Sequence, residues 1–124
     1  LSQGGPAVIV GDVSHAGVPV VTLEAGGREW SAIIDTGFNG DLELPEELRG
    51  TLNEQPVGRL RSALAGGQII EEDAYSVDFP FDGQVFQAVA TFVADSQILI
   101  GTNLLREYHL QIRFASKTLR LERE

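Results

Sequence analysis

The residues of this chain best suited to chemistry are Asp35-Thr36-Gly37, which directly follow an apolar segment from Trp30 to Ile34. The β-branched and aromatic residues of that segment predict a strand, so the carboxylate should lie on a tight turn at a strand end. Thr36 supplies a hydroxyl that can hold the turn, and Gly37 allows a close backbone approach. A rigidly held carboxylate can act in general acid–base chemistry. An ordinary Asx-type turn between strands is the alternative interpretation.

A second segment of the chain strengthens this interpretation. Ile98-Leu99-Ile100-Gly101 is a short apolar run that ends in glycine, which predicts a brief strand. Thr102 to Glu107 follows it and has the pattern of a capped helix start. After Asp35-Thr36-Gly37, the chain enters a further turn at Phe38-Asn39-Gly40, and Leu42-Glu43-Leu44-Pro45 closes the motif.

Together the two segments resemble the retropepsin-like aspartic proteases. The run from Asp35 to Gly40, closed by Leu42 to Pro45, is particularly similar to bacterial and archaeal members with a DTGF motif. The resemblance extends from about Val18 to Glu122, but only residues 33–45 and 98–105 are specific to it. It implies an all-β fold, namely a small closed β-barrel of the retropepsin (acid protease) type with one or two short helices.

The same resemblance implies a homodimeric aspartic endopeptidase that hydrolyses peptide bonds. Asp35 would be the catalytic carboxylate, paired with Asp35 of a second subunit across a two-fold axis. Two carboxylates placed side by side share one proton. The ionised one acts as the general base that takes a proton from water, and the protonated one polarises the substrate carbonyl. Neither a cofactor, a metal ion nor a covalent intermediate is expected.

The neighbouring residues would support the catalytic turn. By resemblance, Thr36 would hydrogen-bond to its counterpart across the two-fold axis, and Gly37 would leave backbone room for the substrate. Ile100 and Gly101 would pack beside the Asp35 turn. The purely structural alternative for Thr36 is a β-branched turn residue, and for Gly37 it is a permissive turn position. For Ile100 and Gly101 the structural role is itself the expected one.

Substrate contacts are expected from a flap and from one bulky residue. Residues 59–75 are the candidate flap, a hairpin whose tip, Ala65-Gly66-Gly67, would close over the substrate and limit the access of water. An ordinary β-turn is the alternative. Phe38 stands where retropepsins usually carry Ala or Ser, so it should narrow the cleft or reshape the pocket nearest the scissile bond.

Two further positions depart from the viral pattern. Asn39 and Thr102 stand where many viral relatives place an acidic residue and an Arg that brace the dimer. Because both charged partners are missing, the dimer contacts should be arranged differently, with the terminal strands from Leu110 to Glu122 as the candidate. A looser dimer is equally compatible with the sequence.

Composition narrows the function. At 124 residues the chain is expected to be one domain, residues 1–124, with residues 1–6 as a candidate disordered end. It carries one Asp-Thr-Gly half-site, so a second subunit must supply the other. The net charge of −9 disfavours nucleic acid, because binding to phosphates needs a basic surface. The absence of Cys excludes disulfides and thiolate catalysis, and with only two His residues metal catalysis is not expected.

Location is less constrained by the sequence. No apolar run approaches the ~18 residues of a membrane-spanning helix, so no membrane span is expected. Without a visible secretory signal, a cytoplasmic location is the default. Because the first residue is Leu1 and not Met, a missing N-terminal signal or anchor is an open alternative.

The patterns elsewhere favour strands and tight turns. Val20 to Glu24 and Arg28 to Ile34 predict a hairpin that delivers Asp35 to a strand end. Pro45 to Arg49 predicts a single helical turn that Gly50 stops. No long amphipathic helix is available to cross over a parallel sheet, which argues against a βαβ fold.

The second half of the chain continues this pattern. Tyr75 to Phe81 alternates apolar and polar residues, which predicts a half-buried strand. Asp82-Gly83 predicts a turn into the next strand, Gln84 to Val93. The last predicted hairpin pairs Leu110, Ile112 and Phe114 with Leu119 and Leu121 around residues 115–117.

Two other functions fit the sequence less well. A retropepsin-fold binding or dimerisation module with little or no peptidase activity is suggested by Phe38, which would crowd the cleft. A glycosidase would also place two carboxylates in a cleft, but nothing in the sequence beyond the acidic residues supports it.

Overall fold

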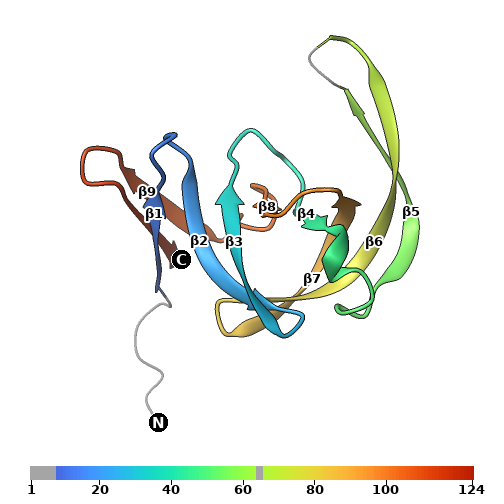
Figure 1. The fold of residues 1–124 in the computed structure, drawn as a ribbon, viewed down its shortest axis with the longest axis horizontal. Helices are drawn as coiled ribbons and strands as arrows, with labels where there is room; N and C mark the ends of the chain where they lie inside the picture. Colours follow the sequence, from blue (N-terminus) through green and yellow to red (C-terminus); the bar gives the residue numbers. More distant parts are fainter. Residues whose placement is uncertain (1–7, 64–65) are drawn as a thin grey trace.

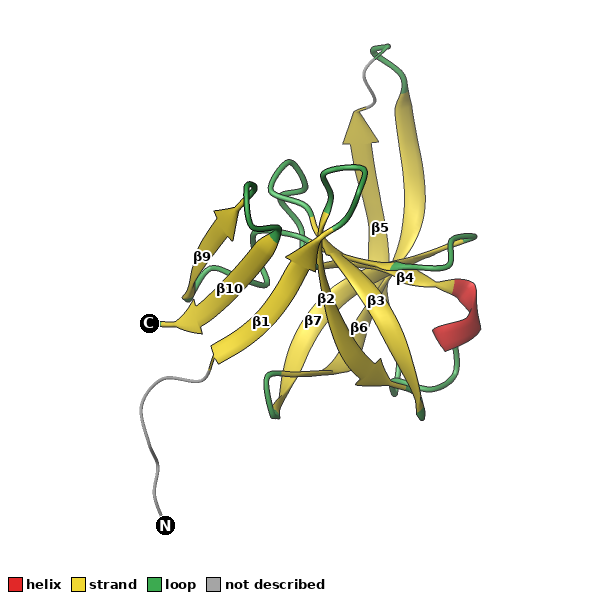
Figure 2. Ribbon diagram, turned by 60° about the vertical axis from the view of Figure 1, so that its left-hand side comes forward, coloured by secondary structure: helices red, strands yellow, loops and turns green. Residues whose placement is uncertain are grey.

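The computed structural model describes residues 8–63 and 66–124, which form strands joined by turns (Figure 1). In chain order the strands are β1 (Val8–Val13), β2 (Pro19–Ala25), β3 (Arg28–Ile34), β4 (Leu42–Pro45), β5 (Gln55–Ala63), β6 (Ile69–Phe81), β7 (Gln84–Val93), β8 (Ile98–Ile100), β9 (Tyr108–Arg113) and β10 (Thr118–Arg123). The 3₁₀ turn η1 (Glu46–Leu48) lies among them and is drawn in red in Figure 2. The candidate disordered residues 1–6 lie outside the described part of the chain.

The described strands form one sheet, in the order β5-β6-β7-β4-β8-β3-β2-β1-β10-β9. The predicted all-β class is therefore confirmed. The predicted closure of the barrel is wrong, because β5 and β9 are the two edges of the sheet and do not pair with each other within the described residues.

β5, at one edge of the open sheet, is irregular. Its pairing with β6 shifts register between Pro56 and Gly58, where Gly58 adopts a φ of 129°. A bulge of this kind bends and twists a strand. Beyond it, β5 and the first part of β6 project from the body as a two-stranded hairpin, on the opposite side of the molecule from β9 (Figure 1).

β8 lies between β3 and β4, the two strands that flank the Asp35 turn in the sequence. It runs parallel to β3, with Ile100 opposite Ile34, and antiparallel to β4, with Ile100 opposite Leu42. All three side chains are buried, as expected of a short apolar strand with neighbours on both sides. Since β3 and β8 are parallel, Asp35 and Gly101 follow the same ends of two adjacent strands.

The core packs against the inner face of this curved sheet. The predicted hairpin of β2 and β3 is confirmed, with its register running from Val20 opposite Ile33 to Ala25 opposite Arg28. The predicted alternation in β6 is also confirmed. The buried face includes Trp30, Ala32 and Ile34 of β3 and Val77, Phe79 and Phe81 of β6.

The turns at the ends of these strands follow their residue types. Asp82 and Gly83 both have positive φ, 57° and 70°, which is the type I′ geometry preferred between antiparallel strands. The hairpin of β9 and β10 is confirmed, with Ile112 opposite Leu119. Phe114, which was expected to join this pairing, lies beyond the end of β9 and is 64% exposed.

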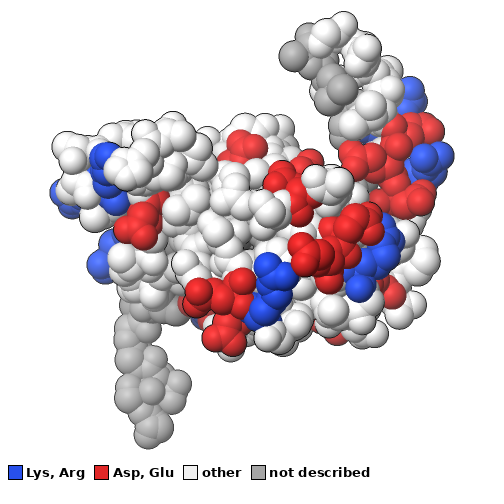
Figure 3. All heavy atoms as spheres, in the orientation of Figure 1, with Lys and Arg blue, Asp and Glu red and all other residues white. Residues whose placement is uncertain are grey.

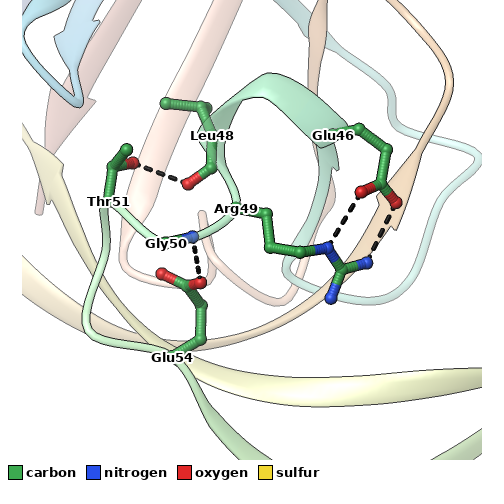
Figure 4. A network of polar contacts seen from close by, with 6 residues as sticks. All are labelled: Glu46, Leu48, Arg49, Gly50, Thr51 and Glu54. Atoms are coloured by element: carbon green, nitrogen blue, oxygen red, sulfur yellow. Dashed lines mark hydrogen bonds and ion pairs between the residues drawn. The ribbon is translucent and has the colours of Figure 1, made fainter.

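The predicted helical turn after Pro45 is confirmed as η1, and Gly50, with a φ of 87°, reverses the chain behind it. Its buried residue is Leu48, which faces the core. Figure 4 shows the polar contacts that close the turn, which join Arg49 to Glu46, Gly50 to Glu54 and Thr51 to Leu48.

The predicted helix start at Thr102 to Glu107 is wrong, because the segment is a succession of turns. The Tyr108 N–H donates to the Leu105 carbonyl at 2.9 Å, a single turn-type bond, and β9 begins at Tyr108. A single bond of this kind closes a turn, whereas a helix needs a repeated series of them along the chain.

Ile100→Ala should lower the free energy of unfolding by about 2–5 kcal/mol, because it empties a fully buried site in a strand of three residues. Ile100→Val, the matched conservative change, should cost only about 0.5–1.5 kcal/mol. Urea denaturation of both variants measures the difference. If the alanine variant lost less than about 1 kcal/mol, β8 would not be the packed link between β3 and β4.

Candidate active site

Asp35 is the first residue after β3, and hydrogen bonds fix its turn. The Asp35 N–H donates to the Ile100 carbonyl at 3.0 Å, and the Phe38 N–H donates to the Asp35 carbonyl at 3.1 Å. The Gly37 N–H donates to Asp35 Oδ1 at 2.9 Å. The turn is therefore an Asx-type turn, and it presents a partly exposed carboxylate whose Oδ2 has no hydrogen bond within the described residues.

The two residues after Asp35 are exposed. In the part of the chain that the structure describes, the Thr36 hydroxyl makes no hydrogen bond. A Cβ at Gly37 would meet only Asp35 Oδ1, at 3.3 Å. Both positions are therefore open to a molecule that approaches the turn from outside the chain.

The loop from Phe38 to Asp41 crosses the end of β8 and is tied to it. The hydrogen bonds run from the backbone N–H groups after β8 to the loop carbonyls. They join Gly101 to Asp41 at 2.9 Å, Thr102 to Phe38 at 2.8 Å and Asn103 to Gly40 at 3.1 Å, the first-named residue donating.

Gly101 is the tightest point of this crossing. A Cβ built on it would lie 2.2 Å from the Gly40 carbonyl oxygen and 2.7 Å from that of Phe38. Contacts this short are not available to any side chain, so the position requires glycine. The structure thus places Gly101 against the loop that follows Asp35.

The Phe38 ring packs on Gly40 and Gly101. The ring is half-buried, and a Cβ on either Gly40 or Gly101 would come within 2.8 Å of it. The aromatic ring therefore packs on the loop's own backbone and also forms part of the wall of a neighbouring cavity. The departure from Ala or Ser at this position is accommodated by glycines that make room for the ring.

Two residues of this loop region were missed by the sequence analysis. The Asp41 carboxylate accepts from the Val89 N–H of β7 at 2.9 Å and from Asn103 Nδ2 at 2.7 Å. It therefore ties the loop to β7 as well as to the chain after β8. An isolated Asp after Gly40 gives no signal of that role in the sequence. Asn103 was not singled out because a helix was expected at Thr102 to Glu107.

The two positions that depart from the viral pattern behave differently. Thr102 is engaged within its own chain, where its hydroxyl donates to the Phe38 carbonyl at 3.4 Å. Asn39 is exposed.

The candidate flap corresponds to the hairpin of β5 and β6. Gly66 and Gly67 are exposed, and a Cβ on either would meet no other atom within 4 Å. Ala65, the other expected tip residue, lies outside the described residues. Ion pairs along the hairpin join Arg59 to Asp73 and Arg61 to Glu71. Figure 3 shows acidic side chains at the base of this hairpin, with basic ones among them.

Two hollows adjoin the Asp35 turn and its loop. One, of about 230 Å³, is largely apolar and is lined by Asp35 and Thr36 together with Leu105, Tyr108 and Leu110. The other, of about 260 Å³, lies between the loop and the base of the hairpin. Its walls include Phe38, Glu43, Leu60, Glu72 and Thr91.

Glu43, in the wall of the second hollow, has an unusual electrostatic environment. Partial burial raises its pKa, and the neighbouring carboxylates of Glu72, Asp35 and Asp95 raise it further. Desolvation and three groups of the same sign therefore disfavour the ionised form of Glu43.

The predicted site residues fall into two groups. The structure brings together Asp35, Thr36, Gly37, Phe38, Ile100 and Gly101. Gly66 and Gly67 lie at the far end of the hairpin and do not touch that group. Among residues 8–63 and 66–124, no cluster of three or more His, Cys, Asp or Glu side chains could hold a metal ion, and no helix is long and apolar enough to cross a membrane.

Solved structures share this fold. A retropepsin-like aspartic protease from Rickettsia conorii matches 99% of this chain and 97% of its own, with a TM-score of 0.64 and 15% sequence identity. The foamy viral protease-reverse transcriptase matches 87% of this chain with a TM-score of 0.59 and 17% identity, and this chain spans only 13% of that protein. No protein-family model and no curated protein matches the sequence. At these identities, the likeness establishes a retropepsin-like fold.

Gly101→Ala should destabilise the protein by about 1–3 kcal/mol or more, because the added methyl group has no space between the Gly40 and Phe38 carbonyls. Gly66→Ala is the matched control, since nothing lies within 4 Å of its Cβ, and it should stay within about 0.5 kcal/mol of wild type. Thermal denaturation compares the two. Equal melting temperatures would show that the loop can move away from β8.

Glu43→Gln should raise the melting temperature at pH 7. The folded-state pKa of Glu43 is raised, so ionised Glu43 costs stability above that pKa, and the cost disappears as pH falls below about 4.3, the ordinary Glu value. The difference from wild type should therefore shrink on acidification. Glu29→Gln, an exposed change near the other end of β3, should leave stability within about 0.5 kcal/mol. A lower melting temperature for Glu43→Gln at pH 7 would contradict this prediction.

Proposed function

We propose that this protein is an aspartic endopeptidase that acts as a homodimer, with Asp35 of each subunit supplying one carboxylate. The observation that carries the proposal is the Asp35 turn itself. A partly exposed carboxylate lies at a strand end, held by hydrogen bonds to Ile100 and Gly37, in a fold shared with solved aspartic proteases.

The proposed chemistry follows from pairing two such carboxylates. Brought together, they cannot both ionise cheaply, so one keeps a proton. The ionised Asp35 takes a proton from water as the water attacks the peptide carbonyl, and the protonated Asp35 polarises that carbonyl. The hydrogen bond from Gly37 to Oδ1 orients each carboxylate and leaves Oδ2 for this exchange.

The surface around Asp35 supports the second subunit. The apolar hollow lined by Leu105, Tyr108 and Leu110 opens beside Asp35 and Thr36, where a second copy would cover it. The Thr36 hydroxyl, which has no hydrogen-bond partner within the described residues, is available to its counterpart across the two-fold axis. A dimer centred on this point brings the two carboxylates together.

The terminal strands offer a second contact. β9 is an edge of the sheet and has only β10 as a neighbour among the described strands. Unpaired backbone groups along an edge strand favour pairing with another chain. We therefore include the hairpin of β9 and β10, within residues 110–122, in the proposed dimer interface.

The hairpin of β5 and β6 would act as the lid. It projects from the body of the molecule (Figure 1). Leu60 and Glu72 at its base line the cavity beside the loop that follows Asp35. Gly66 and Gly67 are exposed, and glycine allows the backbone torsions that closure over a bound peptide would need.

A binding module without peptidase activity is the weaker proposal. The argument for it is that Phe38 crowds the cleft, but the Phe38 ring packs on Gly40 and Gly101. No feature of the described residues favours a glycosidase over a peptidase.

Asp35→Asn should reduce hydrolysis of an unfolded protein substrate to less than about a tenth of wild type, because it removes the ionisable group while keeping the size of the side chain. Mixing it with wild type tests the shared site. With free exchange at a wild-type fraction of one half, about a quarter of full activity should remain per total chain, against about a half if each chain acted alone.

The experiment that mixes wild-type and Asp35→Asn chains needs two controls. Subunit exchange is verified with fluorescently labelled chains, and Glu29→Gln in place of Asp35→Asn should give full activity at every ratio. Activity that falls in direct proportion to the wild-type fraction, with exchange verified, would exclude a shared pair of carboxylates. Unchanged hydrolysis by Asp35→Asn would exclude Asp35 as the catalytic group.

A further inference from the structure

The cavity of about 260 Å³ lies over one face of four neighbouring strands. The sheet order places β5, β6, β7 and β4 side by side, and the cavity is lined from each of them. Glu43 of β4 is opposite Thr91 of β7, and Leu60 of β5 is opposite Glu72 of β6. Residues opposite one another in a sheet share a face, so these side chains converge on the same space.

The cavity combines apolar walls with carboxylates. Phe38, Leu60 and Val89 supply apolar surface, and Glu43 and Glu72 supply negative charge. Neither glutamate has a salt bridge within residues 8–63 and 66–124. The nearby basic residues Arg59 and Arg61 pair instead with acids along the hairpin itself.

Thr91 gives an independent indication that the cavity receives a polar ligand. The residue is 6% exposed and lines the cavity. The Thr91 hydroxyl makes no hydrogen bond to any described residue. It is nevertheless not fully buried, because every fully buried side-chain oxygen among the described residues has a hydrogen-bond partner. The hydroxyl therefore keeps its remaining access through the cavity, where it can accept a hydrogen bond from a bound group.

The charged groups that act on Glu43 share one sign. The charged groups acting on Glu43 are Glu72, Asp35 and Asp95, and Asp41, also in the wall, is occupied by its bonds to Val89 and Asn103. A cation entering the cavity would relieve this repulsion, whereas an anion would increase it.

We propose that this cavity is a substrate subsite that selects a lysine or arginine side chain of the cleaved peptide. Phe38, Leu60 and Val89 would contact the aliphatic part of that side chain, and Glu43 and Glu72 would bind its cationic end, with Thr91 as a further acceptor. The volume suits one side chain, since whole-ligand pockets are usually about 300–1,000 Å³. This inference rests on the proposed peptidase function and names its substrate class.

The test uses a set of eight-residue peptides with one common sequence, in which Arg, Lys, norleucine or Glu is placed at each position in turn. At one position, kcat/KM for Arg or Lys should exceed that for norleucine by about tenfold, and Glu should be the poorest residue. Glu43→Gln should reduce the preference for Arg over norleucine to within about twofold. Glu29→Gln, which removes one negative charge elsewhere, should keep the full preference.

Binding separates this inference from the proposed function. Affinities of the same peptides, fluorescently labelled, are measured by anisotropy with the Asp35→Asn chain and with Asp35→Asn/Glu43→Gln. If no peptide is cleaved by wild type, the peptidase proposal fails, and tighter binding of the Arg peptide that depends on Glu43 would still support the subsite. If the Glu43 variant does not fold, Glu72→Gln replaces it from the other side of the cavity. Equal binding of the Arg and norleucine peptides at every position, or a preference that both glutamine variants retain, would overturn the subsite.

Discussion

The close packing of Gly101 against the loop from Phe38 to Asp41 is the contact on which the rest of the site depends. The backbone atoms approach so closely that no side chain fits between them, and three hydrogen bonds hold the two segments together. This contact fixes the loop after Asp35 while β8 fixes the strand before it. The carboxylate is therefore positioned from both sides by backbone, which varies less in position than a side chain packed on a surface.

The electrostatic environment of Glu43, in the wall of the cavity beside the loop, lowers the stability of the fold. Desolvation and three neighbouring acids raise the pKa of Glu43, so ionising this carboxyl group in the folded chain costs stability. A neutral or apolar residue would fit the same strand without that cost. Residues that destabilise the free protein and face an open cavity are a usual feature of binding sites, because their interactions are completed only by the ligand.

How much could be predicted from the sequence depended on how local each cause was. The strand before Asp35, the turn after it and the hairpin of β2 and β3 follow from residue type and alternation, and they were predicted correctly. The turns from Thr102 to Glu107 depend on where β9 begins. The open edge at β5 depends on how all the strands assemble. The cavity around Glu43 depends on strand order, since β4 and β7 become neighbours only after the whole sheet is assembled. No pattern in the sequence marks such neighbours.

Charge connects the proposed dimer with the proposed subsite. Each subunit carries a net charge of −9, and pairing two of them brings acids near the shared site into mutual repulsion. The apolar hollow beside Thr36 must outweigh that repulsion when a second subunit covers it. Salt would screen the repulsion between subunits beyond roughly 10 Å, and it would also weaken the attraction of Glu43 and Glu72 for a cationic side chain. Because partly buried charges are screened less than exposed ones, association should respond to salt more strongly than selectivity does. The two effects can therefore be separated in one protein by ionic strength alone.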